Sequence, residues 1–344
     1  MRTDSIDLFC HCLPPRYCEA VDRLKERPFF MFDRARRMPV MAELGARFEI
    51  MDRFPGYRQV PCLASPPIEV IAGPETTPEL ARIGNDEVAE MVSRHPDRFP
   101  SFVATLPMNN PEAACAEAER AVRALGAAGV QVFSNVRGRP LDEPEYLAVF
   151  ETMHGLGRPV WLHPARPITW PDYTNEELSK FDLWWALGWP HETAMAMGRL
   201  VFAGLFDRHP DLVVIAHHSG GTVPMMEGRL GPGLDQLGSR ISPGQEHAVE
   251  TSLSERPLDA FKRFWADTAT FGSRAAIECG AAFFGLDRMV FATDMPFDPE
   301  GGPGYIRGTL EAIDGMDLTD AQRHGLLVGH AERLLKRSEP NGEG

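Results

Sequence analysis

GVQVFSNVRGRPLDEPEYLAVFETMHGLGRPVWLH, residues 129–163, contains the unit that repeats along this chain. It begins with a β-branched and aromatic run at 129–134 and ends with a second apolar run at 159–163. The segment between them, Glu143–Gly155, has a proline near its start and a glycine at its end, which is typical of a helix. Two short apolar runs joined by a helix predict a pair of parallel strands with a helical crossover.

The number of such runs predicts the fold. Eight short apolar runs lie at 5–10, 58–64, 101–107, 129–134, 159–163, 212–217, 264–268 and 289–294. Helix-like segments lie between them, at Pro78–His95, Pro111–Leu125, Glu143–Gly155, His191–His209 and Ser273–Phe284. Eight alternating units predict an α/β protein with a (β/α)8 TIM barrel, in which the chemistry occurs at the carboxyl ends of the strands. An open doubly wound sheet would also alternate, but no glycine-rich phosphate loop follows the first run.

Two long connections do not fit the repeating unit. Residues 14–57 form a long first connection, and residues 165–190 carry four of the six tryptophans directly after the fifth run. We expect one barrel domain over residues 1–338, with long insertions at its C-terminal face, and a disordered tail at 339–344. The tryptophan-rich insertion is expected either to cover the pocket as a lid or to pack as a helix on the barrel wall or on a partner subunit.

Composition limits the partners and the compartment. The chain has 344 residues, is 43% hydrophobic and carries a net charge of −14, which disfavours binding to nucleic acid or to an anionic membrane. It contains no apolar run of about 18 residues and no signal-peptide pattern. The six cysteines are scattered without a CxxC pair, as expected for reduced thiols. A cytoplasmic location is therefore expected.

Ligand-type side chains follow four of the predicted strands. FCHCLP (9–14), WLHP (161–164), AHHSGG (216–221) and ATDMPFD (292–298) place His11, His163, His217, His218 and Asp294 at strand ends. Imidazoles and a carboxylate gathered on one rim of a barrel are typical of a metal-assisted active site. Because the side chains of adjacent residues diverge, only one of the two neighbouring histidines is expected to face the pocket. Asp267, in the seventh run, is a candidate for orienting a ligand from behind.

These segments resemble the amidohydrolase superfamily, and within it the aminocarboxymuconate semialdehyde decarboxylase-like branch, the amidohydrolase 2 family. The resemblance covers most of the chain and is carried by IDLFCHCLP (6–14), TLPMNNPE (105–112), GLFDRHPDLVVIAHHSGG (204–221) and ATDMPF (292–297). It implies that His11, His163 and Asp294 are metal ligands and that His218 is an acid or base beside the metal. Phe9 falls on the family's first ligand, normally histidine or glutamate, and has no lone pair to donate.

The resemblance also implies an activity, a metal-dependent and non-oxidative decarboxylation of an unsaturated or aromatic carboxylate. His218 and Asp294 would handle the proton, and zinc is the expected metal, with manganese or no metal as alternatives because of Phe9. An anionic small-molecule substrate needs a cationic partner, for which Arg36 and Arg166 are candidates, and Trp189 of the insertion could stack on a planar ring. Relatives in the family imply a homodimer.

Two alternatives stay open. The same residues could support a metal-dependent hydrolase or hydratase acting on a carbonyl, a thioester or a C–C bond. The barrel could also have lost catalysis and bind a ligand only, which the phenylalanine at the first ligand position favours.

Overall fold

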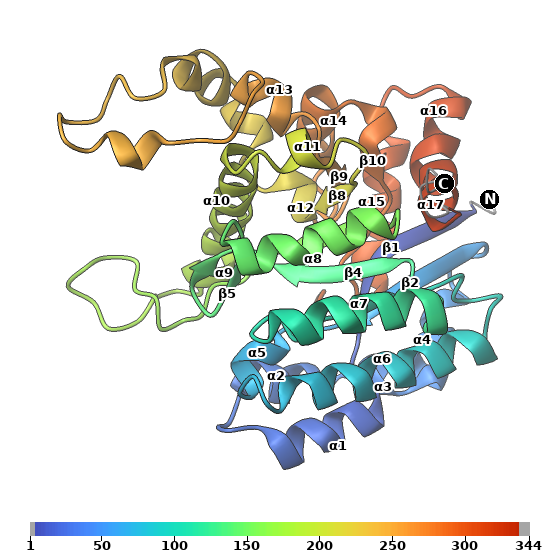
Figure 1. Ribbon diagram of the computed structural model, residues 1–344. Helices are drawn as coiled ribbons and strands as arrows, with labels where there is room; N and C mark the ends of the chain where they lie inside the picture. The colour runs from blue at the N-terminus through green and yellow to red at the C-terminus, as the bar shows by residue number, and fades with distance from the viewer. Residues whose placement is uncertain (1–3, 337–344) are drawn as a thin grey trace, which may run out of the picture.

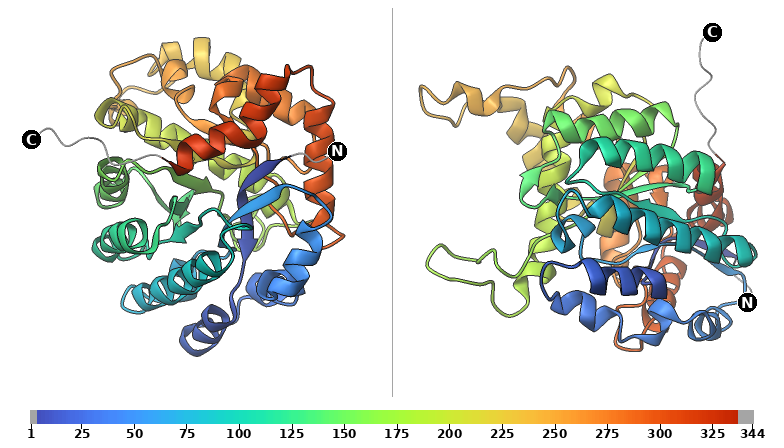
Figure 2. Two further views of the ribbon diagram at one scale, coloured as in Figure 1. Left: turned by 90° about the vertical axis from the view of Figure 1, so that its right-hand side faces the viewer. Right: turned by 60° about the horizontal axis from the view of Figure 1, so that its bottom comes forward.

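Eight parallel strands form the centre of the molecule in the computed structural model, which describes residues 4–336. The helices surround these strands (Figure 2). The eight strands are β1 (Ser5–Cys12), β2 (Tyr57–Leu63), β3 (Val103–Thr105), β4 (Gly129–Phe133), β7 (Val160–His163), β8 (Val214–Ala216), β9 (Trp265–Asp267) and β10 (Met289–Val290). Each coincides with one of the eight apolar runs, so the predicted (β/α)8 barrel is confirmed.

The strands close into a barrel through a few backbone hydrogen bonds. Six of them pair in parallel in the order β10-β9-β8-β7-β4-β3, and β1 pairs with β2. The amide of Leu8 donates to the carbonyl of Phe291, and the amide of Asp294 donates to the carbonyl of Phe9, which joins β1 to the segment after β10. The amide of Gln59 donates to the carbonyl of Arg98, which joins β2 to the chain before β3. A small antiparallel hairpin, β5 (Asn135–Val136) with β6 (Arg139–Pro140), follows β4.

The helices between strands match most of the predicted segments (Figure 1). They are α5 (Ile68–Ile71), α6 (Thr77–Arg94), α7 (Pro111–Leu125), α8 (Pro144–Gly155), α10 (Gly188–Phe202), α11 (Leu205–Arg208), α12 (His217–Gly220), α13 (Pro257–Phe261), α14 (Arg274–Phe284), α15 (Pro303–Asp314), α16 (Asp320–His324) and α17 (His330–Leu335). Turns of 3₁₀ helix lie at η1 (Pro224–Met226), η3 (Leu234–Gln236), η4 (Glu246–Val249) and η5 (Leu286–Arg288), and turns of π helix lie at η2 (Arg229–Gly233) and η6 (Gly325–Gly329). The prediction of one helix over His191–His209 was wrong, because Gly204 has φ 69° and this left-handed conformation separates α10 from α11.

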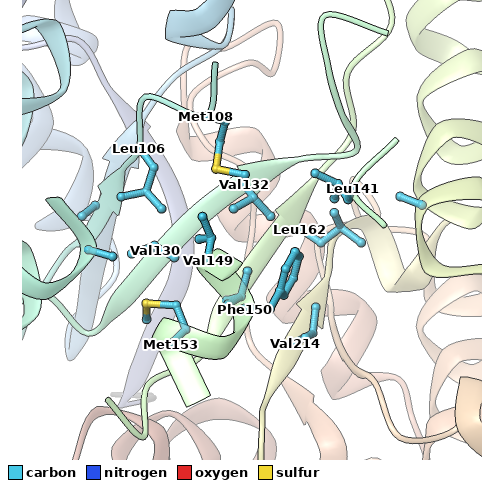
Figure 3. Close-up of a cluster of buried hydrophobic side chains, with 14 of the residues drawn as sticks. Leu106, Met108, Val130, Val132, Leu141, Val149, Phe150, Met153, Leu162 and Val214 are labelled. Carbon is cyan, nitrogen blue, oxygen red and sulfur yellow. The ribbon is translucent and has the colours of Figure 1, made fainter. Parts of the chain in front are cut away.

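The outer face of the barrel is packed against the helices by simple alternation along the strands. Val130 and Val132 of β4 and Leu162 of β7 face α8, where Val149 and Phe150 cover them (Figure 3). The alternate residues on the same strands therefore point into the barrel. Trp161 is one of them, and its indole Nε1 donates to the carbonyl of Leu8 across the interior at 2.9 Å.

The first long connection forms four helices, α1 (Pro15–Leu24), α2 (Phe30–Ala35), α3 (Pro39–Ala42) and α4 (Leu44–Met51). The outer part of the tryptophan-rich insertion extends away from the barrel as a loop, and Phe181 in it is 89% exposed (Figure 1). Its inner part, α9 (Leu183–Ala186) and the start of α10, packs Trp184 edge-on against Trp189, with ring centroids 5.7 Å apart. A second protruding segment, around residues 234–256, was not expected from the sequence.

Among the described residues, no helix has both the length and the apolar character needed to cross a membrane. The expected tail at 339–344 and the expected domain end at residue 338 lie outside the described residues.

Candidate metal and active site

Three buried side chains meet at the carboxyl ends of the strands. His11 lies at the end of β1, His163 ends β7, and Asp294 follows β10 by four residues. One ligand atom from each lies within 4.8 Å of the other two. The closest pair is His11 Nε2 and Asp294 Oδ1, at 2.8 Å. The structure thus brings together the three residues that the sequence analysis named as metal ligands.

Asp7 connects the two chain segments that carry His11 and Asp294. Its Oδ1 accepts hydrogen bonds from the amides of Phe9, at 3.0 Å, and Thr293, at 3.1 Å. Its Oδ2 accepts from the hydroxyls of Tyr57 and Thr293, each at 2.5 Å. Asp294 itself has φ 63°, a left-handed conformation that aspartate tolerates better than most residues. This anchoring turns its carboxylate toward His11.

The surroundings of His163 leave one ring nitrogen free to bind a metal. Its Nδ1 lies 2.6 Å from the carbonyl of Pro164. A carbonyl only accepts, so Nδ1 carries the proton and Nε2 carries the lone pair. Burial, together with the neighbouring imidazoles of His217, His11 and His218, holds the pKa of His163 well below its ordinary value. His163 is therefore a neutral imidazole of the kind that ligates metals.

Phe9 lies inside the barrel among these imidazoles and is fully buried. Its ring centroid is 4.6 Å from that of His11 and 5.6 Å from that of His163. On its other side the phenyl ring lies directly against the imidazole of His217. At position 9 of β1 the site therefore presents an apolar ring, which cannot donate a lone pair to a metal, whereas His11 of the same strand can.

Asp267, predicted from the sequence as a residue that orients a ligand, is paired with His217, a pairing that was not predicted. His217 Nδ1 lies 2.5 Å from Asp267 Oδ2, a close contact that is outside good hydrogen-bond alignment. Asp267 Oδ1 accepts from the amides of Ser219, at 3.1 Å, and Ala269, at 3.0 Å, so this carboxylate also holds the turn that carries both histidines. Burial lowers the pKa of His217 to about 4, which makes its imidazole neutral at neutral pH. Asp267 thus orients a histidine, though not one of the three predicted ligands.

The expectation that only one of the two adjacent histidines faces the site was wrong. His217 continues the inward alternation of β8, whereas His218 has φ 53°, a left-handed conformation that turns its ring back toward the same rim. Their ring centroids lie 5.4 and 6.2 Å from that of His163. His218 is only partly buried, and its Nδ1 lies 2.9 Å from the carbonyl of Ala269, so Nδ1 is the donor and Nε2 is free to exchange a proton.

The predicted substrate-binding residues have different surroundings. Trp189 lies beside the ligands, with its ring centroid 5.4 Å from that of His163, and its Nε1 donates to the carbonyl of Arg166. The guanidinium of Arg166 pairs with Glu192 at 3.0 Å. Arg36 lies near the surface and pairs with Asp22 at 2.6 Å and with Asp33 at 3.6 Å. Both arginines are thus engaged by carboxylates of the chain.

Arg47, a buried cation behind the site, was not predicted from the sequence. Arg47 of α4 is 1% exposed and donates to Gln59 Oε1 at 2.7 Å, to the carbonyl of Val40 at 3.2 Å, and to the carbonyl of His11. No signal in the sequence separates this arginine from the others of the first connection, because its burial depends on how α4 packs.

Several known proteins with similar sequences are named as decarboxylases. Over 266 residues, 77% of this chain and 68% of the relative, the chain is 30% identical to 2-amino-3-carboxymuconate-6-semialdehyde decarboxylase from Dictyostelium discoideum. It is also 30% identical to gamma-resorcylate decarboxylase from Polaromonas sp., over 84% of this chain and 86% of that one.

Solved structures agree on the fold. A dihydroxybenzoic acid decarboxylase from Polaromonas sp. JS666, with bound manganese and the inhibitor 2-nitroresorcinol, superposes with a TM-score of 0.76 at 25% identity and covers 97% of both chains. The 5-carboxyvanillate decarboxylase from Sphingomonas paucimobilis gives a TM-score of 0.80 at 22% identity, covering 97% of this chain and 99% of that one. Residues 8–337 match the amidohydrolase family Amidohydro_2, as the resemblance of the sequence implied. The chain therefore belongs to the amidohydrolase family.

Proposed function

We propose that this protein is a metal-dependent, non-oxidative decarboxylase of an unsaturated or aromatic carboxylate. The observation that carries the proposal is the buried group of His11, His163 and Asp294, with the free Nε2 of His218 on the same rim. The relatives that are named as decarboxylases of resorcylate and of aminocarboxymuconate semialdehyde support it.

The donor set fits a divalent metal. Two imidazoles and one carboxylate, within 4.8 Å of one another, form a ligand set that suits zinc with an open coordination position, or manganese with additional oxygen ligands. The hydrogen bond that fixes the tautomer of His163 is the support that such ligands usually have. We propose zinc as the metal, and the relative with bound manganese supports that ion as the alternative. When bound, the metal would act as a Lewis acid on a substrate oxygen.

Phe9 is central to this proposal. In place of a further ligand it leaves three protein ligands, and its fully buried ring keeps water away from one side of them. We propose that the substitution adapts the coordination of the site and does not abolish metal binding.

His218 is proposed as the acid that drives decarboxylation. In its protonated form, Nε2 would deliver a proton to the carbon that carries the carboxylate. The bond between that carbon and the carboxylate then breaks, its electron pair returns to the unsaturated system, and carbon dioxide leaves. Because His218 is partly exposed, it can take a new proton from solvent. Asp294, in contact with His11, would hold the reacting carbon near His218.

The substrate would lie between this rim and the tryptophan-rich insertion. Trp189, next to His163, offers a flat surface for a planar ring and excludes water from the reacting carbon. Arg166 is the favoured partner for the anionic group, because its backbone carbonyl accepts a hydrogen bond from Trp189 and its side chain is mostly buried. The substrate anion would share or replace the contact of its guanidinium with Glu192.

The test uses protein purified without chelators and aromatic dihydroxybenzoates as probes. Carbon dioxide release with no heavy oxygen from labelled water in the organic product supports decarboxylation. Label in the organic product identifies a hydrolase. His163→Ala and Asp294→Ala should lose both metal and activity. Full activity in both variants, with metal below about a tenth of an equivalent, would exclude a metal-dependent mechanism.

We further propose a homodimer in a reducing, cytoplasmic compartment. All six cysteines are free, as in a reducing compartment. Exposed apolar side chains on the protruding insertion, among them Tyr173 and Phe181, support a surface that a second copy covers. Light scattering on the purified protein would give the mass of one or of two chains.

A further inference from the structure

A cysteine thiol lies behind the metal-ligand candidate His11. In the parallel pairing of β1 with β2, His11 is the register partner of Cys62. Cys62 Sγ lies 3.4 Å from His11 Nδ1 and 3.5 Å from the carbonyl oxygen of Cys10. Both side chains are buried, and in residues 4–336 this thiol is the hydrogen-bond partner of His11 Nδ1.

The ring proton of His11 must be on one nitrogen when a metal is bound and on the other when it is absent. Without a metal, the 2.8 Å contact between Nε2 and the Asp294 carboxylate requires a proton on Nε2, because a carboxylate only accepts. Nδ1 is then an acceptor. A metal ligand instead offers the lone pair of Nε2, which moves the ring proton to Nδ1 and makes Nδ1 a donor. The group that faces Nδ1 must therefore serve both forms of the ring.

A carbonyl cannot do this, because it has no proton to give. His163 has such a carbonyl, that of Pro164, and its tautomer is fixed. A thiol has one S–H and a sulfur with lone pairs, so it can either donate or accept a hydrogen bond. When Nδ1 is the acceptor, the S–H of Cys62 points to the ring. When Nδ1 carries the proton, the sulfur accepts a hydrogen bond from this N–H. The S–H then turns to the carbonyl of Cys10, 3.5 Å away.

We propose that Cys62 is a positioning residue that lets His11 change tautomer on metal binding without leaving a buried ring nitrogen unpaired. The inference rests on the metal site proposed above. Without the thiol, Nδ1 of His11 would be buried and unpaired in both forms: as an acceptor without a metal and as an N–H donor with a metal bound. An unpaired buried N–H in the metal-bound form is costly. A buried cysteine that only filled space would have no such effect on metal affinity.

The test compares three variants at Cys62 with a control variant, all in the full chain. Cys62→Ala and Cys62→Val remove both hydrogen-bonding capacities, whereas Cys62→Ser keeps a group that donates and accepts. Cys12→Ala is the matched control, since Cys12 is also buried, and its thiol contacts the carbonyl of Cys62 and no proposed ligand. Manganese and zinc affinities are measured by competition with a chelator, on protein shown to be folded by circular dichroism.

We expect Cys62→Ala and Cys62→Val to weaken metal binding by roughly 10- to 100-fold, the usual effect of losing a partner of a metal-ligating histidine. Cys62→Ser and Cys12→Ala should stay close to wild type. Nitrogen-15 spectra of the His11 ring should show the proton moving from Nε2 to Nδ1 on metal addition in wild type. Equal affinities in wild type and Cys62→Ala, or a ring that does not change tautomer, would overturn the inference. Failure of wild type itself to bind metal would instead overturn the proposed function.

Discussion

Glu69 is a buried carboxyl group whose replacement should change the pH dependence of stability. It lies on α5, just after β2, is 1% exposed, and its Oε1 has no hydrogen-bond partner among the described residues. Burial raises the pKa of Glu69 from 4.5 to about 8, against the opposing effects of its own backbone amide and of Arg137. In the folded protein the group is therefore neutral at pH 7.

The direction in which stability changes with pH follows from how many protons the folded and the unfolded chain bind. Below pH 4.5 both states are protonated, and the contribution of Glu69 to stability is fully present. Between pH 4.5 and about 8 the unfolded chain loses the proton that the folded chain keeps, so stability falls as the pH rises. Above about pH 8 no further loss is expected. The shift corresponds to a ceiling of about 5 kcal/mol, and we expect on the order of 2–5 kcal/mol after relaxation.

Glu69→Gln keeps the shape of the side chain and is neutral in both states, so it should remove this dependence. The assay is urea unfolding of both proteins from pH 5 to pH 8 with metal chelated, because metal binding also depends on pH. The stability of the variant relative to wild type should rise steadily across this range. Glu79→Gln on α6, where the carboxylate is exposed, is the control and should show no such trend. A difference between Glu69→Gln and wild type that is constant from pH 5 to pH 8 would refute the reasoning.

Three further predictions concern the site. His218→Ala should lower kcat by about 10²- to 10⁴-fold, as expected for a lost proton donor, with metal content unchanged; loss of metal in this variant would contradict the assigned role. Asp267→Asn removes the carboxylate charge that holds the turn carrying His218 and should lower kcat without loss of metal; a pH–rate profile and kcat equal to those of wild type would show that this pair only packs. Phe9→His should tighten metal binding in chelator competition while lowering kcat for the native substrate, and unchanged affinity would show that position 9 does not reach the metal.

The barrel could be predicted because its signals are local. Alternation along β4 and β7 places Val130, Val132 and Leu162 on the outer face and Trp161 on the inner face, and this needs no knowledge of partners. The end of a strand is also a local feature. Since the carboxyl ends of all barrel strands share one rim, His11, His163 and Asp294 could be grouped from the sequence.

The differences between the structure and the prediction from the sequence come from backbone conformation. Two predictions were wrong because a residue adopts the left-handed backbone conformation. At Gly204 this conformation ends the predicted helix, and at His218 it turns the ring back to the rim. Neither residue type requires a positive φ. The conformation is selected by what the turn packs against, which a periodic pattern does not record.

The pattern of apolar runs was enough to predict the eight strands, their common rim and the ligand-type residues on it. Which atoms meet at that rim depends on how the folded strands pair and pack. Cys62 faces His11 because β1 and β2 pair in one register, with an irregularity between Asp7 and Cys10 that shifts the partners. A register depends on contacts between segments some 50 residues apart, and a change of one residue would exchange the inward and outward side chains.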